Sequence, residues 1–453
     1  MKKRLIETVK KALSFNQSVK MGILLAVLGL AGCKASDRGE LVGVQGRGLW
    51  FHPAPIGMAY IPSGTIHTGA STQDGFNSYL MPNKQITVTA FWMDETEITN
   101  NEYRQFVFWV MDSIARYMVD DESLFMEDEE TGQRFINYDE ELDWVEFSED
   151  LEDMYYEEEE RFDGEKSIDT RKLFFNYEWM DYKKAAREDR DKYNPMDRRK
   201  FIKKEKTLIY PDTLCWVRDY TYSLNEPMVR HYFNHVKYDD YPVVGVNWHQ
   251  AKAFCEWRSR YKDRYWKSIE APKTEKFRLP HEHEWEYAAR GGRDANMYPW
   301  GGPYTRNSKG CMLANFKPLR GNYGADGGVY PVRTDAYFPN DYGLYNMAGN
   351  VAEWTKTTYA AASASFMHDL NPAYETDVPE YVPEEDVWEQ SNFTQEGSSI
   401  TLKRKTIRGG SWKDVAHFIQ CGTRTYEYQD TSKCYVGFRT VQSYIGRSNK
   451  DKK

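Results

Sequence analysis

The chain has 453 residues, a formal net charge of −9 and 40% hydrophobic residues, which is enough for one large domain or two ordinary ones. No apolar run beyond the first 33 residues is long enough to span a bilayer, so a protein with several membrane-spanning helices is excluded. The acidic balance argues against nucleic acid as a partner.

A lipoprotein signal peptide is predicted at residues 1–32. A basic start precedes ten apolar residues, Met21 to Leu30, a run that is too short to cross a bilayer. The sequence Leu30-Ala-Gly-Cys33 resembles the bacterial lipobox, which implies cleavage before Cys33 and lipidation of that residue; the alternative is a soluble secreted protein. Because Lys34 replaces the aspartate that can retain lipoproteins at the inner membrane, and no acidic cluster follows, we expect the periplasmic face of the outer membrane.

The rest of the chain consists of segments that differ in composition. Residues 33–56 are glycine-rich and polar, which predicts a tether. Residues 120–165 hold 22 acidic residues and two arginines, and residues 171–206 hold 13 basic and seven acidic ones. Such blocks are usually solvated and flexible, but the interleaved aromatic residues favour a segment that is ordered alone or by a partner. A stretch at about 359–402 is rich in acidic residues, proline and small residues, and a polar tail is predicted at 446–453.

Regular structure is predicted on both sides of the charged blocks. The apolar and small residues of 57–69 alternate around Pro-Ser-Gly and predict a hairpin, while the β-branched and aromatic residues of 86–93 predict a strand. A helix is predicted from about Asn100, where Asn or Thr can cap it. Two more helices are predicted, one after Trp248 and one over 281–289, and the chain beyond them has little regular pattern.

Four blocks stand in a fixed order across the second half of the chain. They read FRLPHEHEWEYAARGG (277–292), YGLYNMAGNVAEW (342–354), RGGSW (408–412) and GFR (437–439). Their order and content resemble the formylglycine-generating-enzyme (sulfatase-modifying factor) family. The resemblance covers about 57–109, 241–358 and 403–442. It implies one α+β domain over 57–445 of the C-type-lectin-like type, with little regular secondary structure and large insertions at about 110–240 and 359–402.

The resemblance also bears on catalysis. Active family members bind one copper(I) ion between two cysteines, since soft thiolates favour that ion. The matching positions are Asp414 and Ile419, which implies no catalytic residues, no copper and a protein that is not an enzyme. The alternative is a shifted copper site that uses Cys421 and Cys434. In the family a disulfide bond crosslinks the domain, and the matching positions imply a disulfide between Cys255 and Cys421.

If Cys33 is lipidated, an odd number of cysteines remains, so at least one thiol is free or paired elsewhere. The remaining cysteines are Cys215, Cys255, Cys311, Cys421 and Cys434.

Structural calcium is implied at two loops of the family. Calcium prefers hard oxygen ligands from carboxylates, amides and backbone carbonyl groups. The matching positions are Asn346, Gly349, Val351 and Glu353 for the first site and Asn315, Phe316, Asp326 and Gly328 for the second. The alternative is that both loops are held by their own hydrogen bonds.

The run His281-Glu-His-Glu284 has the composition of a metal cluster. On a helix, however, side chains two residues apart point in different directions, and the spacing is not that of a zinc protease. We therefore expect solvent-facing histidines. The tryptophans of the blocks are expected in the core; they are Trp248, Trp257, Trp285, Trp354 and Trp412.

A narrower resemblance appears in AFWMDETEITNNEYRQF (90–106) and its continuation to Arg116. This segment resembles the gliding-motility lipoprotein family GldK (PorK) of the type IX secretion machinery. The resemblance implies a structural subunit of a periplasmic ring at the outer membrane, built from copies of itself and a GldN (PorN) type subunit, in contact with other secretion components. The oppositely charged insertion predicts salt-sensitive assembly. The alternatives are a copper-dependent formylglycine-generating oxidase and a lectin-like lipoprotein that binds glycan or peptidoglycan.

Overall fold

The computed structural model describes residues 52–69, 83–127, 132, 134–189, 196–318, 320–376 and 399–446. All of these belong to the second of two compact units, His52–Lys453. The predicted signal peptide, Cys33, nearly all of the tether, the tail from residue 447 and much of the second insertion lie outside the described residues. Within the described ranges, no helix is long and apolar enough to cross a membrane.

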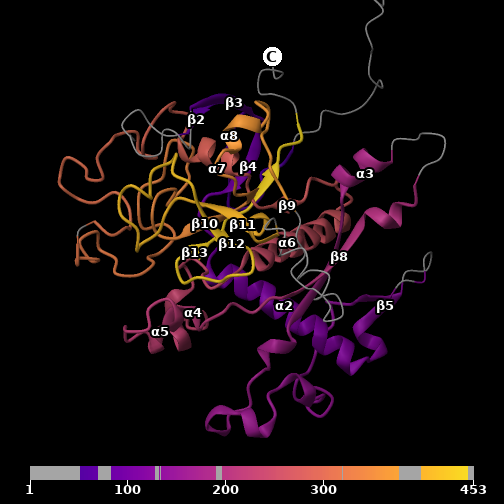
Figure 1. The fold of residues 1–453 in the computed structure, drawn as a ribbon. Helices are drawn as coiled ribbons and strands as arrows, with labels where there is room; N and C mark the ends of the chain where they lie inside the picture. Colours follow the sequence, from indigo (N-terminus) through magenta and orange to yellow (C-terminus); the bar gives the residue numbers. More distant parts are fainter. Residues whose placement is uncertain are drawn as a thin grey trace, which may run out of the picture. The chain divides into compact units, whose positions relative to one another are not determined.

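One four-stranded sheet joins the two ends of the domain. Its strand order is β1 (Met58–Ile61), β4 (Phe91–Asp94), β14 (Val441–Ser443) and β9 (Phe277–Arg278), and every pair is antiparallel (Figure 1). Because segments from the start, middle and end of the domain share this sheet, it forms only when the whole domain folds.

The predicted hairpin over 57–69 is wrong. Its two halves are strands of different sheets, since β1 pairs with β4 whereas β2 (Gly64–Thr68) pairs with β3 (Lys84–Val88). The strand predicted over 86–93 is divided between β3 and β4. The ladder is interrupted where the Thr89 N–H donates to the Asn371 side chain. Local alternation predicted that strands exist, but not their partners.

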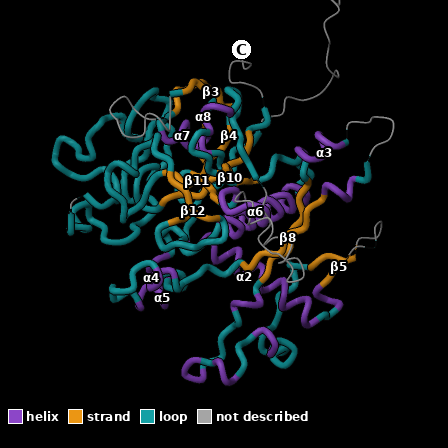
Figure 2. The backbone as a smooth tube through the Cα atoms, in the orientation of Figure 1, coloured by secondary structure: helices purple, strands orange, loops and turns teal. Residues whose placement is uncertain are grey.

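A second sheet lies at the centre of the domain. Its order is β12 (Thr425–Tyr428), β11 (Arg404–Arg408), β10 (Ala352–Thr358) and β13 (Val436–Gly437), with β10 and β13 parallel and the other pairs antiparallel. Nearly every residue of β10 is buried, so both faces of this strand are covered. Loops surround these strands, as Figure 2 shows, which confirms an α+β fold with little regular secondary structure.

The three predicted helices are confirmed as α2 (Asn100–Val119), α6 (Trp248–Ser268) and α7 (Glu282–Ala289). Helices α2 and α6 begin with capping boxes at Thr99 and Asn247. Each cap side chain accepts a hydrogen bond from the backbone N–H three residues later, and the side chain of that later residue accepts one from the cap backbone N–H. Helices α2 and α6 pack together in the largest hydrophobic cluster. All five tryptophans of the family blocks are buried, as predicted.

The described part of the charged insertion is ordered. It contains two antiparallel hairpins, β5 (Phe125–Glu127) with β6 (Arg134–Ile136) and β7 (Phe174–Met180) with β8 (Ile202–Leu208). Side chains of β7 enter the same hydrophobic cluster as α2 and α6. Residues 139–165, here named the acidic lobe, have a small core of their own against α2.

Short helices complete the described structure. The α-helices are α3 (Tyr182–Glu188), α4 (Cys215–Arg218), α5 (Glu226–His231), α8 (Ser363–Phe366) and α10 (Ser399–Leu402). The 3-10 helices are Glu122–Leu124, Glu152–Met154, Glu158–Glu160, Phe162–Gly164, Thr170–Lys172, Arg198–Phe201 and Val236–Tyr238.

Candidate functional site

Asp414 stands at the first position where the family resemblance implies a copper cysteine. Its Oδ2 accepts from the Ser411 N–H at 3.0 Å and from the Ser411 hydroxyl at 2.6 Å. Its Oδ1 lies 3.2 Å from Lys413 Nζ. The carboxylate therefore closes a turn of its own backbone, and a hard oxygen donor does not replace a soft thiolate.

Ile419 stands at the second position and is completely buried. It belongs to an apolar cluster that also contains Tyr298, Ala314, Phe316 and Ala348. An aliphatic side chain has no atom that can ligate a metal, so these two residues do not fit copper(I).

The predicted disulfide between Cys255 and Cys421 is wrong, because both are free thiols. Cys255 lies on α6 in the cluster of Phe254, whereas Cys421 lies in a different cluster with Trp285. Burial raises the pKa of Cys421 to about 12, so its thiol is protonated at neutral pH. The shifted copper site is not formed either, since Cys434 belongs to a third cluster.

The two loops predicted to hold calcium are in direct contact. Gly349 has a φ of 78°, and a Cβ there would lie 2.2 Å from the Asn315 carbonyl oxygen. The next residue, Asn350, donates its backbone N–H to the same oxygen at 2.8 Å. Val351 follows and is fully buried. Glycine at 349 therefore lets the first loop pass against the second.

Glu353, the carboxylate predicted at the first site, is fully buried at the start of β10. Its oxygens lie 2.6 Å from Arg439 Nη2 and 2.7 Å from Arg439 Nε, and Trp285 Nε1 donates to it at 2.7 Å. This bidentate pair connects β10 to the segment before β14. Asn346, the other side chain predicted at this site, forms no hydrogen bond with Glu353 in the described part of the chain. Asn346 instead donates to Glu97, whose charge interacts with that of Glu353.

Glu97 also belongs to this site, although no sequence motif predicts it. Its carboxylate accepts from Asn350 Nδ2 at 3.1 Å and from Asn346 Nδ2 at 3.2 Å. Burial, opposed by Arg439 and reinforced by Glu353, raises the pKa of Glu97 to about 8. The Arg439 guanidinium bonds Glu353 directly and influences Glu97 only through its charge, so a proton or a bound cation would compensate the second buried carboxylate.

The chemistry of this first site fits calcium. The Oδ1 atom of Asn346, and that of Asn315 in the adjoining second loop, are buried and have no hydrogen-bond partner in the described part of the chain. Amide and carboxylate oxygens are the ligands that calcium takes. In the described ranges no group of three His, Cys, Asp or Glu side chains could hold a metal ion. Amide and carbonyl oxygens would therefore have to complete the ligands of a calcium ion. No spacing marks Glu97, because it is 249 residues from Asn346.

The second loop is closed by its own hydrogen bonds. Asp326 accepts from the Phe316 N–H at 2.6 Å and from the Gly328 N–H at 3.2 Å, and burial raises its pKa. Asn315 donates to the Tyr330 carbonyl oxygen at 3.0 Å. The four predicted residues therefore lie together, in the arrangement expected for a loop that holds itself.

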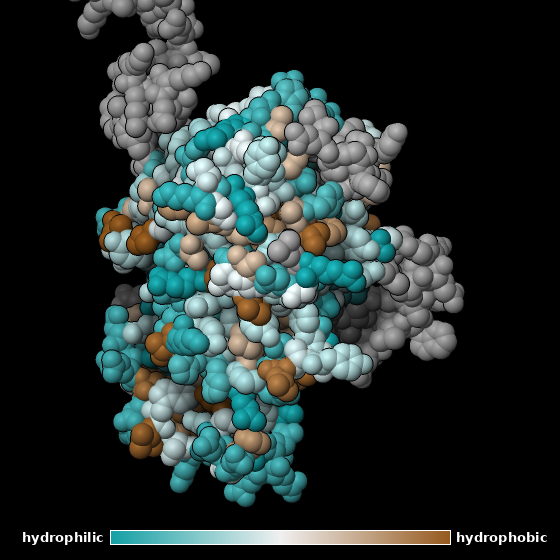
Figure 3. Space-filling view, turned by 90° about the vertical axis from the view of Figure 1, so that its left-hand side faces the viewer, coloured by the Kyte–Doolittle hydropathy of each residue, from teal (hydrophilic) through white to brown (hydrophobic). Residues whose placement is uncertain are grey.

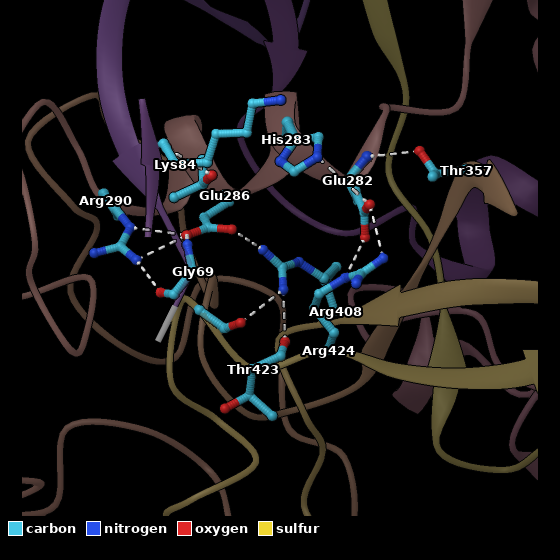
Figure 4. A network of polar contacts seen from close by, with 12 residues as sticks. Gly69, Lys84, Glu282, His283, Glu286, Arg290, Thr357, Arg408, Thr423 and Arg424 are labelled. Atoms are coloured by element: carbon cyan, nitrogen blue, oxygen red, sulfur yellow. Dashed lines mark hydrogen bonds and ion pairs between the residues drawn. The ribbon is translucent and has the colours of Figure 1, made fainter. Parts of the chain in front are cut away.

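A buried network of charges lies beside these loops and centres on α7 (Figure 4). Glu282 forms a bidentate pair with Arg424 at 2.7 and 2.9 Å. Glu286 pairs with Arg290 at 2.7 Å and also with Arg408. Burial alone would raise the pKa of both carboxylates, but the arginines hold each pKa below its ordinary value. The network fastens α7 to the segment in which an oxidase would carry its copper.

The expectation of solvent-facing histidines on this helix is wrong. His283 is 9% exposed, and its Nε2 lies 3.3 Å from the Met367 sulfur and 3.5 Å from Glu282. His281 caps the helix, and burial lowers its pKa to about 4. Polar residues on α7 are inside because the helix is enclosed on several sides and each carboxylate has a cation partner.

The chain is similar in sequence to known proteins over about half of its length. The chain is 41% identical over 208 residues to the inactive C-alpha-formylglycine-generating enzyme 2 of Bos taurus, a match that covers 44% of this chain and 50% of that protein. It is 30% identical over 214 residues to the formylglycine-generating enzyme of Mus musculus, covering 46% and 45%. The chain thus spans about half the length of these curated relatives.

The structure is also similar to that of PvdO from Pseudomonas aeruginosa, with a TM-score of 0.44 and 14% identity over 85% of this chain and 94% of that one. The sulfatase-modifying factor enzyme 1-like domain matches residues 53–444, which is nearly the whole folded unit. The chain therefore belongs to the formylglycine-generating-enzyme (sulfatase-modifying factor) family.

Proposed function

We propose that this chain is a non-catalytic structural lipoprotein of the type IX secretion and gliding machinery, anchored through Cys33 at the periplasmic face of the outer membrane. We infer the absence of catalysis from two residues, Asp414 and Ile419. One closes a backbone turn and the other fills an apolar core, so neither position offers a thiolate. Loss of activity has a precedent in the family, since one relative is named an inactive enzyme.

Calcium has a structural role in this proposal. Asn346, Glu97 and Glu353 would hold it, together with the carbonyls of Gly349 and Val351. A bound calcium ion would neutralise the charge that Arg439 leaves uncompensated. The ion would thereby stabilise the contact between the two loops.

Assembly into a ring with further copies and a GldN (PorN) type subunit is supported by the insertion. Residues 110–240 are additional to the blocks that the family shares, and their described part presents a folded, charged surface. Of the 15 acidic side chains in the acidic lobe, only Glu152 and Glu160 form an ion pair with a described residue. A surface with so much unneutralised charge is suited to a cationic protein partner.

Two experiments test the proposal. Cryo-electron microscopy of the lipidated protein, purified in mild detergent, is expected to show rings that contain many copies and a co-purifying subunit. Monomers without a partner would contradict the structural role, and retention of such monomers on peptidoglycan sacculi would support the lectin-like alternative.

The second experiment measures oxidation of a cysteine peptide by the copper(I)-loaded protein. We expect no formylglycine from the wild type. An active family enzyme with the same peptide is the positive control, and the wild type without copper is the blank. Turnover by the wild type would refute the assignment of Asp414 and Ile419 as replacements of the copper ligands.

A further inference from the structure

An apolar groove runs along the exposed side of the second half of α6. Its volume is about 800 Å³, and segments from the start of the domain and from the insertion form its walls. We name it the α6 groove, and its main apolar lining residues are Pro53, Ile56, Met126, Tyr261, Tyr265 and Phe277. Ile56 is 95% exposed and Tyr265 is 62% exposed, so the described residues leave this surface largely uncovered.

By contrast, apolar residues on the face shown in Figure 3 lie singly or in small groups among hydrophilic ones. A large uncovered apolar groove indicates an interaction site rather than ordinary surface.

Cations without a described carboxylate partner lie at the groove or one helical turn from it. Arg264 lines the groove, and Arg260 and Lys267 lie about one turn to either side of it on α6. All three are exposed, and none of them forms an ion pair with a described residue. Arg264 lies 4.0 Å from the centre of the Tyr138 ring instead. Asp139 is the carboxylate among the described lining residues. The groove therefore combines aromatic surface with an excess of positive charge, which suits an acidic segment that carries apolar side chains.

The acidic lobe has that chemistry. Leu142, Leu151 and Met154 hold it together as a folded element. Val145 is 84% exposed and Phe162 is 73% exposed, and both stand in acidic sequence whose carboxylates, apart from Glu152 and Glu160, form no ion pair with a described residue. Because these two side chains are exposed, the lobe of the same copy does not fill the groove with them.

We propose that the α6 groove binds the acidic lobe of a second copy of this chain. The inference rests on the proposed ring function and names one of its contacts. Identical subunits close into a ring when each presents two different, complementary surfaces. The groove and the lobe are such a pair: one is apolar and cationic, and the other is anionic with exposed apolar side chains.

Photo-crosslinking tests the contact in the full lipidated protein. Tyr265 is replaced by p-benzoylphenylalanine in an unlabelled copy, which is co-assembled with nitrogen-15-labelled wild type. With labelled wild type in excess, mass spectrometry is expected to find Tyr265 joined to a labelled peptide from residues 142–165, beyond Asp139, which already lines the groove of its own copy. Crosslinks only to unlabelled residues 142–165, or only to a different subunit, would overturn the inference.

Charge reversal tests the electrostatic part. Arg260→Glu with Arg264→Glu is expected to weaken self-association by at least about tenfold, because like charges then face each other. Adding Glu157→Lys and Glu158→Lys is expected to restore it. A matched control reverses two exposed cations elsewhere that pair with no described carboxylate, Arg187→Glu with Arg198→Glu, and is expected to assemble normally. Circular dichroism verifies the fold of each variant.

The outcomes separate this inference from the proposed function. Wild-type rings that tolerate the Arg260 and Arg264 reversals would refute the groove contact and leave the ring function standing. A wild type that stays monomeric at every concentration would refute both. Restored assembly in the compensating variant would support the pairing of groove and lobe.

Discussion

Replacing Arg424 with methionine tests the view that the buried charges of α7 stabilise the domain. The side chains of Glu282 and Arg424 are 0% and 7% exposed, and two hydrogen bonds of 2.7 and 2.9 Å join them. Removing one partner of a buried pair leaves the other charge uncompensated, at a cost of about 3–5 kcal/mol. Since domains are stable by only about 5–15 kcal/mol, we expect a large decrease in the urea midpoint.

A double variant distinguishes an uncompensated charge from lost packing. In Glu282→Met with Arg424→Met no charge of the pair remains, so the double variant is expected to be more stable than Arg424→Met alone. The control is Arg293→Met, which breaks an exposed pair with Asp341 and is expected to leave the midpoint unchanged. A small effect of Arg424→Met, or a double variant less stable than the single one, would refute the reasoning.

The pH dependence follows from the same pair. In the wild type, burial opposes ionisation of Glu282 but Arg424 and its neighbours hold the pKa below its ordinary value. This carboxylate therefore contributes stability above its unfolded pKa of about 4.3, and the contribution is lost as the pH falls. Without Arg424 the folded pKa rises, so the difference in unfolding free energy between wild type and variant is expected to narrow from pH 7 to pH 4.

Three further outcomes are expected. Calcium at 100 times its dissociation constant should stabilise the wild type by about 2.7 kcal/mol in thermal unfolding. The variant Asn346→Ala should lose this stabilisation by calcium. An equal stabilisation of wild type and variant would exclude the calcium site. Reductant should leave the melting temperature unchanged, and alkylation of the denatured, unreduced protein should label both Cys255 and Cys421. Gly349→Ala should destabilise by roughly 1–3 kcal/mol, because its Cβ would strike the Asn315 carbonyl and its φ is positive; a neutral variant would contradict this close approach.

The sequence was sufficient to predict properties that depend only on which residue stands at a position. Asp414 and Ile419 cannot act as thiolates in any conformation, so the absence of copper ligands at these positions needed no structure. The helices from Asn100 and Trp248 were also predictable, because their caps and their apolar spacing are local features.

Pairing between distant segments was not predictable in the same way. The hairpin predicted over 57–69 and the disulfide between Cys255 and Cys421 both failed for this reason. Strand partners and thiol partners depend on which segments meet in the folded chain. In this domain the segments that meet are often more than 200 residues apart, as Glu97 and Asn346 are.

By itself, the sequence determined the family, the α+β class and the loss of the copper thiolates, since these follow from local patterns and from side-chain chemistry. Only the tertiary structure decided the electrostatics. It buried Glu97 within electrostatic range of Glu353 and Arg439, and it buried His283 of α7, which had been expected to face solvent. The reason is physical: the protonation and partners of a charge depend on its burial and on neighbours brought together by folding.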